Sequence, residues 1–110
     1  MLYNLTRDQC SHPQILPKVL GTPKAMSLDE IDHIVYLFVQ AGRVATSAGF
    51  DGVQIHAAHG FLVSQFLSPH TNRRTDEYGG TSYKRMTLLR RLVVELRAAC
   101  PPPLLSLIHI

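Results

Sequence analysis

One stretch near the middle of the chain decides the fold, and it reads Gly49-Phe50-Asp51-Gly52-Val53-Gln54-Ile55-His56-Ala57-Ala58-His59-Gly60-Phe61. Gly49 predicts the end of a helix, because glycine takes the left-handed conformation that follows many helices at little cost. Apolar and polar residues then alternate, which predicts a strand over residues 51–56 with two different faces. In a barrel of strands and helices, Val53 and Ile55 suit the face that meets the helices.

The polar face of this strand carries Gln54 and His56, and in such a barrel both side chains would point inward. His56 then lies at the carboxyl end of the strand, where barrel enzymes place their chemistry. A polar loop follows from Ala57 to about Gly80, interrupted by a short apolar patch over residues 61–67. A loop of this length in a compact fold is usually functional or disordered.

Helices are predicted on both sides of this strand. Ser27-Leu28-Asp29-Glu30 is a capping box, so we expect a helix over 27–48. Thr81 is a plausible cap for a second helix over 82–99, which the prolines at 101–103 end. Another strand begins near residue 104, and two strands joined through a helix form a parallel pair.

A parallel sheet needs cover on both faces, which two strands and two helices cannot supply. We therefore interpret the 110 residues as part of a larger α/β domain. Three prolines make residues 1–26 an irregular connecting segment.

Composition excludes several classes of function. Basic pairs occur at Arg73-Arg74, Lys84-Arg85 and Arg90-Arg91, and the net charge is +3. No interleaved aromatic residues or nucleic-acid motif accompany them, so we expect no nucleic-acid partner. No apolar run approaches the ~20 residues that span a bilayer, and the N-terminus lacks a signal-peptide pattern, so we expect a cytoplasmic protein without a membrane partner. Cys10 and Cys100 fit either one disulfide or two free thiols, and we favour free thiols.

Three segments carry a resemblance to a known family: residues 49–60, Gln65-Phe66-Leu67-Ser68-Pro69, and the segment Thr71-Asn72-Arg73-Arg74-Thr75-Asp76-Glu77-Tyr78-Gly79-Gly80. In this order and near this spacing, they resemble the Old Yellow Enzyme family of FMN-dependent NAD(P)H oxidoreductases and ene-reductases over residues 26–99. The resemblance implies a partial (β/α)₈ barrel, in which the strand at 51–56 is the fourth. Residues 1–110 would then be a fragment of a single FMN-binding barrel domain.

The resemblance also implies a site. The family's substrate-anchoring pair, His-x-x-His or His-x-x-Asn, falls on His56 and His59. Two donors there would stabilise the negative charge that grows on the oxygen of an activated alkene during hydride transfer, as an oxyanion hole does. The implied cofactors are FMN and, as reductant, NADH or NADPH. The implied acceptor is an alkene such as an α,β-unsaturated carbonyl, or a quinone. We assign no cofactor-binding residue and no metal ligand.

Phe61 departs from the family pattern. Many members have tyrosine at this position, where it protonates the α-carbon, and phenylalanine has no proton to give. The reductase prediction is weakest at this step, and a flavin-dependent isomerase is an alternative. Two further alternatives are an inactive truncated chain and, less favoured, a metal-dependent hydrolase that uses His56 and His59. Residues 106–110 do not fit the family pattern, and we interpret them as a non-native tail.

Overall fold

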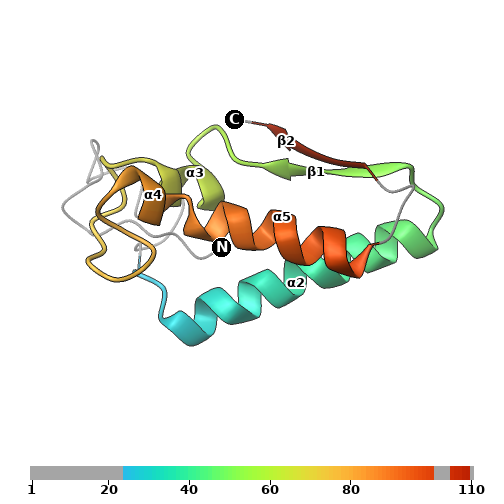
Figure 1. Cartoon of the computed structure of the whole chain (residues 1–110), viewed down its shortest axis with the longest axis horizontal. Helices are drawn as coiled ribbons and strands as arrows, with labels where there is room; N and C mark the ends of the chain where they lie inside the picture. Colours follow the sequence, from blue (N-terminus) through green and yellow to red (C-terminus); the bar gives the residue numbers. More distant parts are fainter. Residues whose placement is uncertain (1–23, 101–104, 110) are drawn as a thin grey trace, which may run out of the picture.

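The computed structural model describes residues 24–100 and the backbone of residues 105–109. Its elements, in order, are α2 (Leu28–Ser47), β1 (Gly52–His56), α3 (Leu62–Leu67), α4 (Ser82–Arg85), α5 (Thr87–Ala99) and β2 (Leu105–His109). Figure 1 shows α2 and α5 side by side beneath the two strands, with α3 and α4 gathered at one end.

The two strands form a parallel pair, as the sequence predicts. The register runs from Gly52 opposite Leu105 to His56 opposite His109. Because α5 lies between the two strands in sequence, β1, α5 and β2 make one βαβ unit. Both strands point toward the end of the molecule where α3 and α4 lie (Figure 1). The carboxyl end of β1 and the loop that follows it therefore share one end of the fold.

The capping box at the start of α2 is confirmed. The Glu30 amide donates to Ser27 Oγ at 3.1 Å, and the Ser27 amide donates to the Glu30 carboxylate at 2.7 Å. The Ser27 amide, followed by Lys24, lowers the pKa of Glu30. At the other end, Gly49 has a φ of 81°, which confirms it as the residue that stops the helix. The predicted limits, 27–48, match the observed Leu28–Ser47 with its two cap residues.

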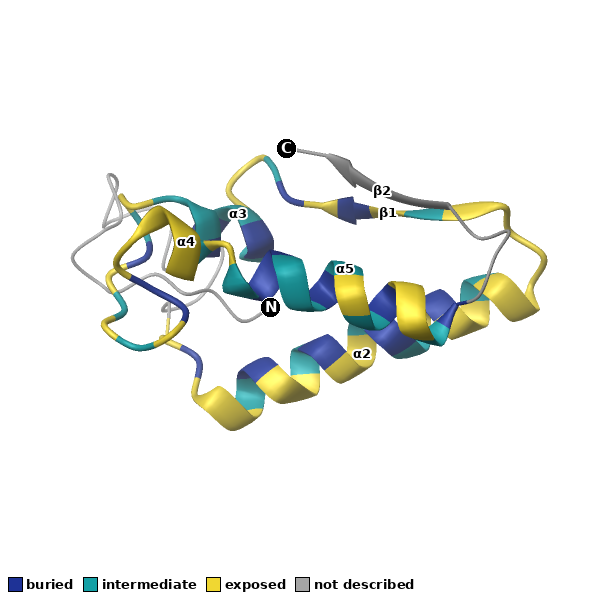
Figure 2. Cartoon of the chain, in the orientation of Figure 1, coloured by how far each residue is buried: buried dark blue, intermediate teal, exposed yellow. Residues whose placement is uncertain are grey.

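The core lies between α2, α5 and β1, where buried residues of the three elements face one another (Figure 2). Its fully buried side chains include Ile31 and Val35 of α2, Ile55 of β1 and Leu92 of α5. Gly42 lets α2 lie close to α5 and the residue that ends it, since a Cβ at Gly42 would lie 2.7 Å from Leu96 Cδ2 and 2.9 Å from Cys100 Sγ. Cys100 is a buried free thiol, and Cys10 lies outside the described residues.

Two predictions about the second half of the chain are wrong in detail. The expected loop over 57–80 contains the short helix α3, and the expected helix over 82–99 is divided at Met86 into α4 and α5. Thr81 caps α4 as predicted, since its hydroxyl accepts from the Lys84 amide. Arg90 and Arg91, one of the basic pairs noted in the sequence, are both half-buried.

Near its two ends the chain is described only in part. Of the predicted connecting segment over 1–26, residues 24–26 are described, and they are irregular as expected. Residues 105–109, which include most of the predicted non-native tail, form β2. Within the described residues, every helix is too short or too polar to cross a membrane.

Candidate functional site

The candidate site begins on the face of β1 that turns away from the helices. Gln54 and His56 are exposed on this face, whereas Ile55 is buried on the opposite one. The alternation predicted for the strand is therefore present. It places the two polar side chains together, with His56 as the last residue of the strand.

A tight turn carries the second histidine. The Phe61 amide donates to the Ala58 carbonyl at 3.3 Å, and the two residues between them have positive φ, 58° at His59 and 73° at Gly60. Positive φ at both central positions is the pattern of a type I′ turn. Among residues other than glycine, asparagine, aspartate and histidine adopt this conformation most readily. The backbone therefore favours histidine or asparagine as the second donor, the two residue types that the family resemblance implies for this position.

The turn brings the two histidines together. His59 Nδ1 lies 3.3 Å from His56 Nε2, and the ring centroids are 5.0 Å apart with the planes tilted by 40°. A neutral imidazole has one N–H and one acceptor nitrogen, so in this contact one ring donates to the other. Each ring also has a form in which the facing nitrogen carries the proton. Two such nitrogens at this separation suit one oxygen atom that accepts from both.

Phe61 lies beside this pair. Its ring centroid is 5.2 Å from that of His56, and 43% of the residue is exposed. The next phenylalanine in the chain, Phe66, lies in a different environment. Phe66 is fully buried with its edge against the Tyr78 ring, whereas Phe61 adjoins the histidines at the surface. The position that the resemblance singled out is therefore next to the candidate donors.

Two buried side-chain amides support the loop around the site, and neither was recognised from the sequence as support for it. Gln65 in α3 is 2% exposed and Asn72 is 4% exposed. Gln65 Nε2 donates to the Gly60 carbonyl at 2.6 Å, within the histidine turn. Asn72 Nδ2 donates to the carbonyls of Phe66 and Tyr78, each at 2.7 Å. For Gln65 a signal existed in the sequence, because a polar residue inside the apolar patch at 61–67 must find hydrogen-bond partners when buried.

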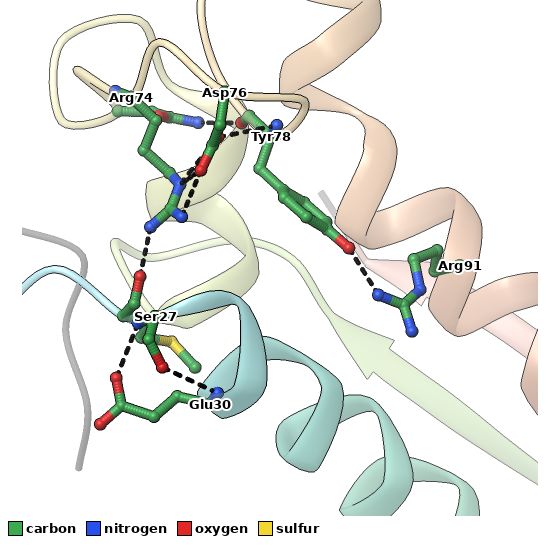
Figure 3. A network of polar contacts seen from close by, with 8 residues as sticks. Ser27, Glu30, Arg74, Asp76, Tyr78 and Arg91 are labelled. Carbon is green, nitrogen blue, oxygen red and sulfur yellow. Dashed lines mark hydrogen bonds and ion pairs between the residues drawn. The ribbon is translucent and has the colours of Figure 1, made fainter.

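The charged segment over residues 73–78, here called the clamp, joins the loop to the chain just before α2 (Figure 3). The Arg74 guanidinium binds the Asp76 carboxylate and also donates to the Met26 carbonyl at 2.6 Å, next to the start of α2. The Arg74 guanidinium holds the pKa of Asp76 below its usual value. Two arginines, Arg73 and Arg74, precede Asp76 in the sequence, and the structure shows Arg74 as its partner.

The clamp extends to both long helices. Arg91 of α5 donates to the Tyr78 hydroxyl and to the Asp32 carboxylate of α2, at 2.5 and 2.7 Å. The Asp32 carboxylate, followed by Tyr78, raises the pKa of Arg91. These contacts join the segment to α2 and α5, and they fix the loop of the candidate site against the helices.

The ring nitrogens of His56 and His59 can act as hydrogen-bond donors. Within residues 24–100, no three His, Cys, Asp or Glu side chains gather as potential metal ligands. His56 and His59 are two nitrogen donors, and zinc sites in proteins take at least three protein ligands. The arrangement is suited to donating two hydrogen bonds to one ligand atom.

Comparison with known proteins identifies the family. The family model for the NADH:flavin oxidoreductase / NADH oxidase family matches residues 6–101. The chain belongs to this family. It is 46% identical over 83 residues to the NADH-dependent flavin oxidoreductase iliE of Neonectria sp. (strain DH2), and 46% identical over 84 residues to an NADPH dehydrogenase of Bacillus subtilis (strain 168). Each alignment covers 76% of this chain, but only 11% and 25% of the respective relative.

A solved structure confirms the predicted fold. The chain is similar to morphinone reductase in complex with tetrahydroNAD, with a TM-score of 0.72 and 40% sequence identity. The match covers 79% of this chain and 24% of that one. The fold is therefore that of part of a (β/α)₈ barrel, and the resemblance to the Old Yellow Enzyme family is confirmed. The chain spans a quarter or less of the length of these relatives.

Proposed function

We propose that this chain supplies the substrate-anchoring segment of an FMN-dependent NAD(P)H oxidoreductase of the ene-reductase type, active as part of a longer chain. The acceptor would be an activated alkene, such as an α,β-unsaturated carbonyl, or a quinone. The observation that carries the proposal is the 3.3 Å approach of His59 Nδ1 to His56 Nε2 at the carboxyl end of a barrel strand. Family membership supplies the flavin and the nicotinamide as the cofactors in question.

Hydride transfer to an enone is assisted by two hydrogen-bond donors that point at its carbonyl oxygen. When hydride reaches the β-carbon of an enone, the electron pair of the double bond moves toward the carbonyl oxygen. Donors already in place stabilise that charge without reorganising, and this is where hydrogen bonds contribute most to catalysis. His56 and His59 can both donate to the oxygen when each facing nitrogen carries its proton. The turn and the strand hold the two rings in this relation before any ligand arrives.

The described residues fit the substrate side of a flavin site. His56, Gln54 and the Phe61 ring offer donors and an aromatic surface at the carboxyl end of β1, and we assign none of them to the flavin phosphate. Bound FMN would supply the hydride and carry the redox change. The role of this chain would be to orient the acceptor and to polarise its carbonyl group.

An uncovered apolar surface favours function within a longer chain. An apolar groove of about 380 Å³ runs between α2 and β1, lined by residues that include Phe38, Ala41, Phe50 and Val53. Phe50 is 66% exposed. In a complete barrel each strand pair is covered by further elements, since parallel sheets are buried on both faces. We also propose a cytoplasmic location, which the buried free thiol of Cys100 favours.

A second candidate rests on Phe61. Phe61 has no phenolic hydroxyl. The site therefore offers two hydrogen-bond donors to an oxyanion, but at this position it lacks the proton donor that the resemblance implies. A flavin-dependent isomerase is consistent with that set of groups, because charge stabilisation at the oxygen serves isomerisation as well as reduction.

The test uses the full-length protein that contains this segment. We expect it to purify with a flavin absorbance spectrum and, without oxygen, to reduce 2-cyclohexenone through the flavin with consumption of NADH or NADPH. Conversion of a β,γ-unsaturated ketone to its conjugated isomer without consumption of reductant would favour the isomerase. A protein without flavin that is also unable to bind added FMN would contradict both.

A further inference from the structure

Gln65 connects α3 to the turn that carries His59. It is 2% exposed, and its Nε2 donates to the Gly60 carbonyl at 2.6 Å. Its own backbone amide donates to the Phe61 carbonyl at 2.9 Å, and its carbonyl accepts from Thr71 Oγ1 at 2.8 Å. Three groups of one residue thus contact Gly60, Phe61 and Thr71, and two of these neighbours directly follow His59 in the sequence.

The Gly60 carbonyl belongs to the peptide that leads out of the turn. His59 has a φ of 58°, a conformation that costs energy for any residue with a Cβ and that persists when surrounding contacts fix it. The hydrogen bond from Gln65 fixes the orientation of the peptide between Gly60 and Phe61. Without that donor the peptide keeps its 3.3 Å hydrogen bond from the Phe61 amide to the Ala58 carbonyl but loses the shorter one at its carbonyl oxygen, and the turn can relax to one in which His59 leaves the left-handed region. The His59 ring would then move away from His56.

We propose that Gln65 is a positioning residue for substrate binding, which it serves by holding the His59 turn in its left-handed conformation. The inference rests on the proposed anchoring role of His56 and His59. Gln65 does not touch the acceptor in this account. It sets where His59 Nδ1 stands relative to His56 Nε2, and hence whether one oxygen can accept from both rings.

Asn72 offers a matched control for a purely structural role. It too is a buried side-chain amide that donates to backbone carbonyls, but its acceptors are Phe66 and Tyr78 rather than the turn. Replacing either amide by leucine removes buried hydrogen bonds and should lower stability. Only the Gln65 change should alter the geometry of the histidine pair.

The experiment measures the dissociation constant of p-hydroxybenzaldehyde for the flavin-loaded full-length protein, from the change in the visible flavin spectrum. We expect Gln65→Leu and the closer isostere Gln65→Met to raise the dissociation constant roughly ten-fold, the equivalent of one hydrogen bond at the ligand oxygen. We expect Asn72→Leu to leave it within about two-fold of the unchanged protein, even where its midpoint of unfolding is lower. The rate of flavin reduction by NADH should be unchanged in Asn72→Leu.

A double-mutant cycle separates positioning from a general effect. In a His59→Ala background, adding Gln65→Leu should have no further effect on ligand affinity, because the donor that Gln65 positions is already gone. Equal effects of Gln65→Leu in both backgrounds would overturn the proposal. So would an unchanged dissociation constant in Gln65→Leu and Gln65→Met, or loss of flavin by both while Asn72→Leu retains it. If His59→Ala alone binds the ligand normally, the proposed anchoring function itself fails, whatever Gln65 does.

Discussion

Asn72→Leu should strongly destabilise the protein, because it removes the partners of two buried carbonyl groups. Asn72 is 4% exposed and donates to Phe66 and Tyr78 at 2.7 Å, while its side-chain oxygen accepts from the Arg74 amide at 3.1 Å. A buried polar group left without a partner costs about 1–3 kcal/mol, so the two carbonyls together cost about 2–6 kcal/mol. The Arg74 amide is only part-buried, and water can replace its partner.

The assay is chemical denaturation of the flavin-loaded full-length protein, with the midpoint followed by flavin release and by circular dichroism. Glu77→Gln is the matched control, since Glu77 is exposed in the same loop. We expect a clearly lower midpoint for Asn72→Leu and a midpoint close to the unchanged protein for Glu77→Gln. If Asn72→Leu unfolds at the same denaturant concentration as the control, then Asn72 does not hold this loop and the reasoning is wrong.

Three further predictions follow from the same structure. Phe61→Tyr should speed net alkene reduction, since a positioned general acid contributes typically ~10²–10⁴-fold, and leave flavin reduction by NAD(P)H unchanged; stopped-flow measurement of both half-reactions checks this. The isolated chain should unfold without a cooperative transition, because its strand pair lacks neighbours; a normal m-value for 110 residues would contradict this. The Asp76 carboxylate has a lowered pKa in the folded state, so its contribution is complete above the unfolded value, roughly 4, and is lost as the pH falls through the folded value. Asp76→Asn should therefore reduce the acid sensitivity of unfolding, measured as the denaturation midpoint between about pH 5 and pH 2.

Elements with strong local signals were predicted well from the sequence. The capping box and Gly49 predict the ends of α2 to within one residue. The capping box supplies hydrogen-bond partners for backbone amides at the start of the helix, and Gly49 takes the left-handed conformation that ends it. The alternation of apolar and polar residues was enough to predict β1. The partner of Asp76 is Arg74, which lies only two residues away in the sequence. These features depend on residues close in sequence, which is why they can be recognised without a structure.

Features that depend on distant contacts were missed. The six residues of α3 are too few to show a helical period, and Phe61 at its start makes no side-chain cap. No glycine or proline marks the interruption at Met86. Arg90 and Arg91 look like surface residues in the sequence, but both are half-buried, and Arg91 binds Asp32 on α2.

The candidate site was predicted in part. The resemblance placed His56, His59 and Phe61 together, and the structure brings the three rings side by side. The left-handed conformation of His59 was not foreseen, because positive φ at a residue other than glycine has no clear sequence signal. The support of the turn by Gln65 likewise depends on a helix, α3, that the sequence did not reveal.

The most direct test of the account is a titration of the full-length flavoprotein with p-hydroxybenzaldehyde, compared among the unchanged protein, His56→Ala, His59→Ala and His33→Ala. His33 is an exposed histidine on α2, away from the turn, and serves as the control. Loss of a hydrogen bond to a charged ligand atom costs roughly 1.5–3 kcal/mol, so we expect each site variant to bind roughly ten- to a hundred-fold more weakly and the control to bind normally. Unchanged affinity in both His56→Ala and His59→Ala, with flavin still bound, would contradict the claim that these two histidines anchor the acceptor.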